Sequence, residues 1–273
     1  MILFPILGII FILIIGAASF MNFHPVFGGK ANSEQQEKYR KSSNFKDGLF
    51  QNSTETIMEM GFIEGLKMIP EYLDKTAREP KSNIPVQKLD SLEIQNRIGQ
   101  ETRLTWFGHS TFLLEMDGLK ILIDPMFGPS PSPIAALGSK RYSKELPIDI
   151  ERLPEIDLVV FSHDHYDHLD YESVLRIKDK VKQFYVPLGL ENHLTKWGVK
   201  GSKIQSFDWW DEAEFHGIKF ACTPARHFSG RGFGDRFSTL WASWVIKGQN
   251  DNIFFSGDSG YGSHFKEIGK KYG

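Results

Sequence analysis

The sequence predicts an α/β fold in which mixed sheets are covered by helices. After Gly99 the chain consists of short apolar runs separated by turn residues, a pattern typical of strands. Between these runs lie two segments with the composition of short helices, Tyr171–Lys180 and Glu191–Trp197. Strands with interspersed helices favour sheets that pack beneath helices. A dense group of histidines and aspartates directly after one strand places chemistry at the edge of such a sheet.

The predicted strands follow one another at short intervals within residues 100–273. The first three form a meander, because Met116, Asp117 and Gly118 make a hairpin turn between the second and the third. The second helix ends before Gly198, a residue type that commonly follows a helix C-terminus. The predicted strands are 104–107, 111–115, 120–124, 158–162, 183–186, 218–223, 239–247 and 253–256.

The N-terminal segment, residues 1–22, is uncharged and almost wholly apolar. If residues 1–20 form a helix, its length would be about 30 Å, which is enough to cross the hydrocarbon core of a bilayer. We therefore expect a hydrophobic helix that acts as a single N-terminal membrane anchor. The alternative is a signal segment that is removed on export, since the small residues from Gly16 to Ser19 could be cleaved. The absence of a basic stretch at the start favours the anchor.

Residues 23–99 are more polar and are expected to form a linker and one amphipathic helix. Residues 30–48 are rich in Ser, Asn, Gln, Lys and Glu, which indicates a linker or a loosely held arm. Asn52 and Glu55 give a helix-capping signal, and Pro80 and Pro85 would end the helix. Its apolar stripe favours packing against the main domain over docking to a membrane surface. The stripe consists of Phe62, Leu66, Ile69 and Leu73.

The charge argues against a nucleic-acid-binding protein, and the cysteine content excludes a fold held by intramolecular disulfides. The net charge of −2 provides no basic field, so we expect no nucleic acid as a partner. Cys222 is the only cysteine, so an intramolecular disulfide is impossible. The fold must therefore be held by its core and by any metal that it binds.

The strongest functional signal is the six-residue segment that follows the apolar strand at 158–162. It contains three histidines and two aspartates, and imidazole with carboxylate suits zinc or a similar divalent ion. His227 and Asp258 also follow predicted strands and are further candidate ligands, although each alone would more often be a turn residue. The segment reads His163, Asp164, His165, Tyr166, Asp167, His168.

These residues, in this order, resemble the metallo-β-lactamase superfamily. Neighbouring motifs are similar to those of the N-acyl-phosphatidylethanolamine-hydrolysing phospholipase D branch, and ascorbate-6-phosphate lactonase-like proteins share much of the pattern. The resemblance covers about residues 102–273, which we expect to form the hydrolase domain. The motifs that carry it are 105–111 (TWFGHST), 123–125 (IDP), 161–170 (FSHDHYDHLD), 223–227 (TPARH) and 256–261 (SGDSGY).

The resemblance implies a four-layer αββα sandwich with a dinuclear zinc site at one edge of the two sheets. His163, His165 and His227 would bind the first zinc ion, Asp167 and His168 the second, and Asp258 both. The family supplies one more histidine downstream to the second ion. After Asp258 this sequence has only His264, at the expected start of a helix, and it stops at Gly273. We therefore expect a C-terminally incomplete domain whose second metal site lacks its usual final histidine.

The resemblance also implies an activity. Two zinc ions would activate a hydroxide for phosphodiester hydrolysis of the phospholipase D type, releasing N-acylethanolamine and phosphatidic acid from N-acyl-phosphatidylethanolamine-like lipids. A phospholipid would then be the substrate, and the N-terminal segment would hold the site at the membrane. Asp167 and Asp258 are the expected catalytic carboxylates. The alternatives are a hydrolase of a soluble ester, lactone or phosphodiester, and an inactive truncated domain tethered to the membrane.

Five further residues are expected near the site but outside the ligand set. Asp164 would orient a histidine or move a proton, and Asp124 would accept a hydrogen bond from a metal-bound histidine. His109 is expected to be a structural hydrogen-bonding residue. The remaining two, Arg226 and Arg231, could offset charge on the phosphoryl oxygens.

Overall fold

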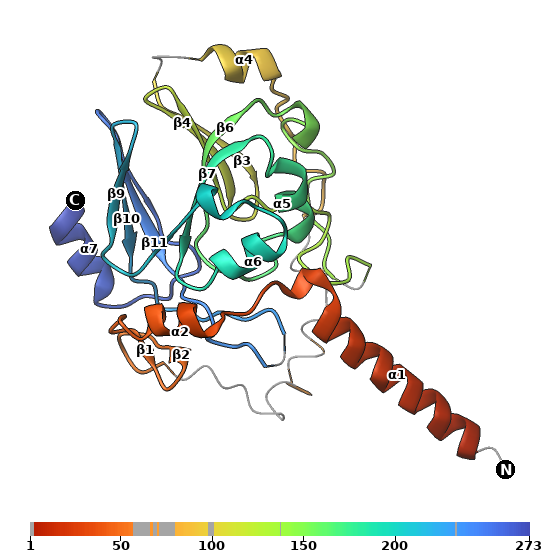
Figure 1. Cartoon of the computed structure of the whole chain (residues 1–273). Coiled ribbons are helices and arrows are strands. Elements are labelled where there is room, and N and C mark those ends of the chain that lie inside the picture. Colours follow the sequence, from red (N-terminus) through yellow and green to blue (C-terminus); the bar gives the residue numbers. More distant parts are fainter. Residues whose placement is uncertain are drawn as a thin grey trace.

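The computed structural model describes residues 3–56, 66–67, 70, 80–97, 101–136, 138–232 and 234–273. Two β-sheets lie face to face at the centre of the molecule (Figure 1). The first has the strand order β3-β4-β5-β6-β7-β8 and the second β12-β11-β10-β9. Their bounds are β3 (Arg103–Gly108), β4 (Thr111–Met116), β5 (Leu119–Ile123), β6 (Ile156–Val160), β7 (Val181–Pro187), β8 (Ile204–Phe207), β9 (Glu212–Phe215), β10 (Ile218–Thr223), β11 (Ser243–Lys247) and β12 (Asn252–Phe255).

The first sheet is mixed, as the sequence predicts. Strands β3, β4 and β5 are antiparallel neighbours, whereas β5, β6, β7 and β8 run parallel. The second sheet is antiparallel throughout. The predicted hairpin turn between β4 and β5 is confirmed, because Asp117 and Gly118 both have positive φ, 48° and 79°. The parallel strands end at one edge of the sheet, which is where loops can gather functional side chains.

Alternating side chains of β6 separate two layers of the core. Leu158 and Val160 are buried between the two sheets, while Val159 is buried on the opposite face. On that face lie the helices α5 (Tyr171–Ile177) and α6 (Glu191–Lys196). Each of these buried side chains contributes about 1.5–3 kcal/mol of hydrophobic free energy. One strand thus links a sheet–sheet layer and a sheet–helix layer.

The fourth layer is α7 (His264–Tyr272), which covers the second sheet (Figure 1). Its Ile268 packs against Ala221 of β10 and Val245 of β11. The order of layers is therefore helix, sheet, sheet, helix, as predicted. The other short elements are η1 (Pro25–Phe27), α2 (Ser33–Tyr39), β1 (Phe45–Lys46), β2 (Leu49–Phe50), α4 (Ser91–Asn96), η2 (Ile150–Arg152) and η3 (Gly201–Lys203).

The N-terminal apolar segment forms α1 (Leu3–Phe23), which projects away from the sheets (Figure 1). Among the helices of the described residues, none combines the length and hydropathy needed to cross a membrane.

Residues 30–48 are more ordered than their polar composition indicates. Asn32 and Gln35 form a reciprocal capping box at the start of α2. The helix ends in Tyr39, which is 1% exposed and packs against the rings of Phe45 and Phe50. The expectation of a linker or loose arm is wrong here, because three aromatic anchors provide the apolar area that the polar residues lack.

Other differences concern the strands, whereas most of the predicted amphipathic helix lies outside the described residues. Strands β8 and β9 were not expected, and β11 begins only at Ser243 rather than at residue 239. Of the predicted apolar stripe, Leu66 is described and is 49% exposed. The other three members, Phe62, Ile69 and Leu73, lie outside the described residues.

Candidate metal centre

Loops at one edge of the two sheets bring the predicted ligands together. The segment 163–168 follows β6, His227 follows β10, and Asp258 follows β12. Asp124 follows β5, the parallel neighbour of β6. Because these strands end at the same edge, residues far apart in the sequence converge there.

The first cluster contains three imidazoles. The Nε2 atom of His163 lies 3.0 Å from Nδ1 of His165, and that atom lies 3.2 Å from Nε2 of His227. The three nitrogen atoms can face one ion, since all lie within 4.8 Å of one another. Three histidines with an open position form a common catalytic zinc site. The donor set therefore fits the metal that the sequence predicts.

The second cluster combines two carboxylates and two imidazoles. His168 Nε2 lies 3.2 Å from Asp258 Oδ1, and His109 Nε2 lies 3.0 Å from Asp167 Oδ2. The rings of His163 and His168 are only 4.0 Å apart between centroids, so the two clusters are adjacent. The structure thus gathers all six predicted ligands and adds His109 to them.

His264 occupies a different position. It begins α7, as expected, and its Nε2 atom lies 2.9 Å from the hydroxyl oxygen of Ser259. Within the described part of the chain, it belongs to no group of metal-ligand atoms.

Asp124 fixes the orientation of His168. Its Oδ2 atom accepts a hydrogen bond from His168 Nδ1 at 2.6 Å, and both side chains are fully buried. Its Oδ1 atom accepts from the backbone N–H of Ser162 at 2.6 Å. Because Nδ1 is occupied, the other ring nitrogen faces the second cluster, as expected for a carboxylate that supports a metal ligand.

Burial and neighbouring charges set the protonation states at the centre. Burial, followed by the neighbouring imidazoles, lowers the pKa of His163, and the same two effects lower the pKa of His227 to about 4. Burial opposes the charged form of His168 also, but hydrogen bonds with Asp124 and Asp258 raise its pKa to about 10. Burial would raise the pKa of Asp167, yet its hydrogen bond with His109 holds it well below the ordinary value. The centre thus offers neutral imidazole at His163 and His227 and ionised carboxylate at Asp167, the forms that bind metal, whereas the imidazole of His168 holds a proton that a metal ion would have to displace.

These shifts predict a stability optimum for the metal-free protein near pH 6.5. The lowered pKa of His227 favours the folded state above 6.5, and that contribution is lost as the pH falls towards 4. The raised pKa of His168 favours the folded state below 6.5, and that contribution is lost as the pH rises towards 10. Thermal melts between pH 4 and 10 measure the effect. In His227→Gln the melting temperature should fall less between pH 6.5 and 4 than it does in the wild type. A melting temperature that rises steadily from pH 7 to 10 would contradict it.

Asn52 holds the backbone of His227, a contact that the sequence analysis missed. Its Nδ2 atom donates to the carbonyl of His227 at 2.8 Å, and its Oδ1 atom accepts from the N–H of the same residue at 3.1 Å. The indole N–H of Trp241 also donates to Oδ1, at 3.1 Å. We expected Asn52 to cap a helix, and no local pattern links it to a residue 175 positions away.

Asp164 is buried outside both clusters, and its contacts support the segment 163–168. Its carboxylate accepts from the N–H of Gly230 at 2.8 Å and from the hydroxyl of Thr239 at 3.0 Å, and it lies 3.4 Å from Nε2 of His193. The histidine that it contacts is therefore His193 and not a predicted ligand. Asp164 thus lies beside a histidine, as expected, although not beside one of the predicted ligands, and a role in moving a proton stays a prediction.

The two arginines differ in exposure. Arg231 is 4% exposed and donates to the carbonyls of Asp164 and Leu169, at 2.6 and 2.7 Å, so it holds the loop rather than facing substrate as expected. Arg226 is exposed, and its guanidinium donates to the hydroxyl of Thr56 and the carbonyl of Tyr261. A role for Arg226 in charge neutralisation stays a prediction.

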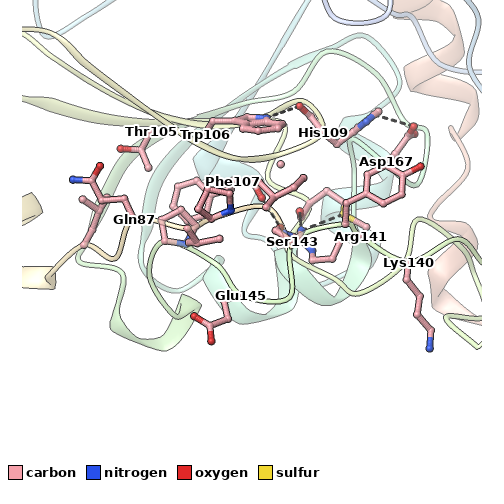
Figure 2. Close-up of a pocket in the computed structure, with 18 of the residues that line it drawn as sticks. Gln87, Thr105, Trp106, Phe107, His109, Lys140, Arg141, Ser143, Glu145 and Asp167 are labelled. Atoms are coloured by element: carbon pink, nitrogen blue, oxygen red, sulfur yellow. Dashed lines mark hydrogen bonds and ion pairs between the residues drawn. The ribbon is translucent and has the colours of Figure 1, made fainter. Parts of the chain in front are cut away.

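A pocket of about 730 Å³ opens beside the second cluster (Figure 2). His109 and Asp167 belong both to its wall and to that cluster. Trp106 and Phe107 line it from β3, and Arg141 from the segment 139–147. The Arg141 guanidinium donates to backbone carbonyls, including that of Phe107 at 2.9 Å, and so fixes this wall. A substrate lying in this pocket would approach the candidate metal centre at the second cluster.

Comparisons with known proteins agree with this arrangement. The family model described as "Beta-lactamase superfamily domain" matches residues 120–273. An uncharacterized protein of Mycobacterium tuberculosis is 40% identical over 236 residues, which cover 85% of this chain and 62% of that protein.

Two lipid-acting relatives are also similar. The N-acyl-phosphatidylethanolamine-hydrolyzing phospholipase D 1 of Caenorhabditis elegans is 36% identical over 202 residues, covering 70% of this chain and 56% of that protein. The mitochondrial enzyme of the same description from Saccharomyces cerevisiae is 32% identical over 166 residues, covering 58% of this chain and 34% of that protein. The chain thus spans 62% or less of the length of these relatives.

Proposed function

Because the chain belongs to the β-lactamase superfamily and has its α/β metallo-β-lactamase fold of metal-dependent hydrolases, we propose that it is a zinc-dependent phosphodiesterase of the phospholipase D type. Its substrates are N-acyl-phosphatidylethanolamine-like lipids, and its products are N-acylethanolamine and phosphatidic acid. The observation that carries this proposal is the junction of two ligand clusters with an adjoining pocket. The similarity to the nematode and yeast phospholipases supports the choice of substrate.

The ligand clusters fit two zinc ions. His163, His165 and His227 would hold the first, while Asp167 and His168 would hold the second with Asp258. Zinc supplies a Lewis acid and a nucleophile derived from water at neutral pH. The chain itself contributes ionised carboxylates at Asp167 and Asp258, whose pKa values are held low although burial opposes this. Asp124 keeps the His168 ring in place.

The pocket suits a substrate that is both apolar and charged. Its wall includes the exposed indole of Trp106 and the apolar side chains of Ile84 and Val86. Asp167 marks the end at which the second cluster lies. An amphiphilic diester could place its apolar part along this wall and its phosphate at the cluster.

The test measures hydrolysis by the purified, zinc-loaded chain. N-acyl-phosphatidylethanolamine in detergent micelles is compared with a lactone and a small aryl phosphodiester, and released N-acylethanolamine is quantified by mass spectrometry. We expect turnover of the lipid to exceed that of either soluble substrate. Hydrolysis of only the lactone or the aryl diester would assign the chain to soluble substrates. At most one bound zinc ion, without any turnover, would assign it to the inactive, tethered class.

We also propose that α1 holds the protein at a lipid surface. Among the described side chains of this helix, ten large apolar ones are exposed, and such a surface is unfavourable in water. The ten are Phe4, Leu7, Ile9, Ile10, Phe11, Ile12, Leu13, Ile14, Ile15 and Phe23.

The triple substitution Ile9→Lys, Ile12→Lys and Leu13→Lys is expected to release the protein from phospholipid vesicles, because each added charge opposes burial in hydrocarbon. Co-sedimentation with vesicles measures binding, and turnover of the soluble aryl diester should stay unchanged as the control. Unaltered vesicle binding would contradict the role of α1. N-terminal sequencing of the protein from its host separates a retained helix from a segment removed after export.

A further inference from the structure

The joining segment, residues 25–29, lies between α1 and α2 and runs past α6 (Figure 1). There the N–H of Gly29 donates to Nδ1 of His193 at 3.0 Å. The other ring nitrogen of His193, Nε2, lies 3.4 Å from Oδ2 of Asp164. We propose that His193, held by Gly29, is a positioning residue for the first metal ion and acts through Asp164. This inference rests on the proposed function, because it requires that the first cluster binds zinc.

Asp164 is placed so that its position determines that of two ligands. His163 and His165 are its neighbours in the chain, and their facing ring nitrogens are 3.0 Å apart. Residue 164 belongs to no helix or strand, so no regular ladder of hydrogen bonds fixes it. Its carboxylate is fully buried, and its place depends on the groups that it contacts. A shift of residue 164 would therefore move both imidazoles.

The hydrogen bond from Gly29 determines which nitrogen of His193 carries the hydrogen. A backbone N–H can only donate, so Nδ1 accepts and has no hydrogen of its own. The neutral ring then carries its hydrogen on Nε2, the atom that faces Asp164. The opposite tautomer would present a lone pair to the carboxylate, and two acceptors repel each other. Gly29 thus sets the donor that His193 offers to Asp164.

Two glycines allow the joining segment to come this close to α6. Gly28 has a φ of 79°, and a Cβ atom there would lie 1.9 Å from Nδ1 of His193. A Cβ atom at Gly29 would lie 2.2 Å from the carbonyl oxygen of Asn192. Both distances are far shorter than van der Waals contact. The bond to His193 therefore requires that both residues lack a side chain.

Arg231 connects the joining segment to residue 164 by a second route. Its Nε atom donates to the carbonyl of Val26 at 3.0 Å, and its Nη1 atom donates to the carbonyl of Asp164 at 2.6 Å. The guanidinium is planar and rigid, so it holds these two acceptors at a fixed separation. The joining segment thus supports residue 164 through its side chain, by His193, and through its backbone, by Arg231.

The competing interpretation is that these contacts only attach the joining segment to α6. Their loss would then lower the melting temperature but leave the zinc affinity of the folded protein unchanged. Gly29→Ala separates the two interpretations, because it disturbs the contact without altering His193 or the ligands. Gly201→Ala is the matched control, since a Cβ atom at Gly201 would meet no atom of the described residues within 4 Å.

Two substitutions of His193 test the donor itself. His193→Leu removes the hydrogen bond donor towards Asp164. His193→Gln keeps one, because the nitrogen of a side-chain amide carries hydrogens whatever its other contacts are. Glutamine should therefore restore most of the zinc affinity that leucine loses. Adding Gly29→Ala to His193→Gln should cause no further loss, since this donor does not depend on Gly29.

The experiment is a zinc titration of the metal-free proteins in competition with a chromophoric chelator, well below the melting temperature of each variant. In Gly29→Ala and His193→Leu we expect one equivalent to bind about tenfold more weakly, the lower end of the loss caused by removing a partner of a metal ligand. Gly201→Ala should bind zinc like the wild type. NMR spectra of the imidazole nitrogens add a second readout, because they report the tautomer of His193 and show which ligands bind the weakened ion. If Gly29→Ala does not fold, the leucine and glutamine variants decide.

The outcomes separate the inference from the proposed function. Unchanged zinc affinity in both Gly29→Ala and His193→Leu would overturn the inference and leave the proposed function intact. A loss in His193→Leu alone, or a wild-type His193 with its hydrogen on Nδ1, would contradict the role of Gly29. The expected affinities without hydrolysis of the lipid would support the inference and overturn the proposed function. A wild type that binds no zinc would overturn both.

Discussion

Replacing His165 with asparagine is expected to abolish hydrolysis while leaving the protein folded. Its Nδ1 atom lies 3.0 Å from His163 Nε2 and 3.2 Å from His227 Nε2, so it is central to the first cluster. In the proposed function this residue would help to hold the ion that would supply the nucleophile, so we expect turnover to fall by about a thousandfold or more, equivalent to about 4 kcal/mol of transition-state stabilisation. Turnover of N-acyl-phosphatidylethanolamine and of the aryl diester measures the loss.

His216→Asn provides the control, because it removes an exposed imidazole outside both clusters. Its activity should equal that of the wild type. Removal of metal with a chelator should reproduce the loss in the wild type, and added zinc should reverse it. Full activity of His165→Asn, or of the chelated wild type, would show that the clusters do not carry the reaction.

Replacing Asp124 with alanine is expected to destabilise the fold. The carboxylate is fully buried and bonds to Ser162 N–H and His168 Nδ1, each at 2.6 Å. Alanine would remove the charged acceptor that these two groups share with the Ser162 hydroxyl, and breaking such a buried charged pair costs about 3–5 kcal/mol. The φ of 41° at this position adds strain for alanine. At about 2–4 °C per kcal/mol, the melting temperature should fall by roughly 6–20 °C.

The variant Asp124→Asn separates stability from metal binding. Asparagine accepts the positive φ and can still receive the Ser162 hydrogen bond, so its fold should be less affected. It no longer provides a carboxylate for His168, and we expect the affinity of the second site to fall by about 10–100-fold. Zinc competition measures this change. An alanine variant that melts like the wild type would contradict the structural role of Asp124.

Local patterns explain why the sequence could predict most of the ligands. The segment 163–168 lies next to its strand, and a strand followed by alternating histidine and aspartate is visible without any tertiary contact. The apolar run of β6 likewise predicts a buried strand, whereas the four layers are implied by the family resemblance; only the structure shows Leu158 and Val160 on one face and Val159 on the other. His227 and Asp258 needed the family resemblance, because a lone residue after a strand has no local signal of its own.

The rest depends on contacts between distant segments. Arg231 has the charge of a substrate-binding residue, and only the fold shows that it is buried against loop carbonyls. Residues 30–48 have a polar composition, and only packing shows that Tyr39 anchors them. His109 is one of nine histidines in the sequence, and its place beside Asp167 comes from the pairing of β3 with β4.

The hydrogen bonds between Asn52 and His227 determine how much of the chain is needed for a complete candidate metal centre. The family match starts at residue 120 and already includes all six predicted ligands. A shortened protein that starts there would nevertheless lack the amide that fixes the backbone on both sides of His227. The segment around Asn52 therefore belongs to the candidate metal centre, and a truncation, fusion or domain exchange that respects only the family boundary would separate a predicted ligand from its support.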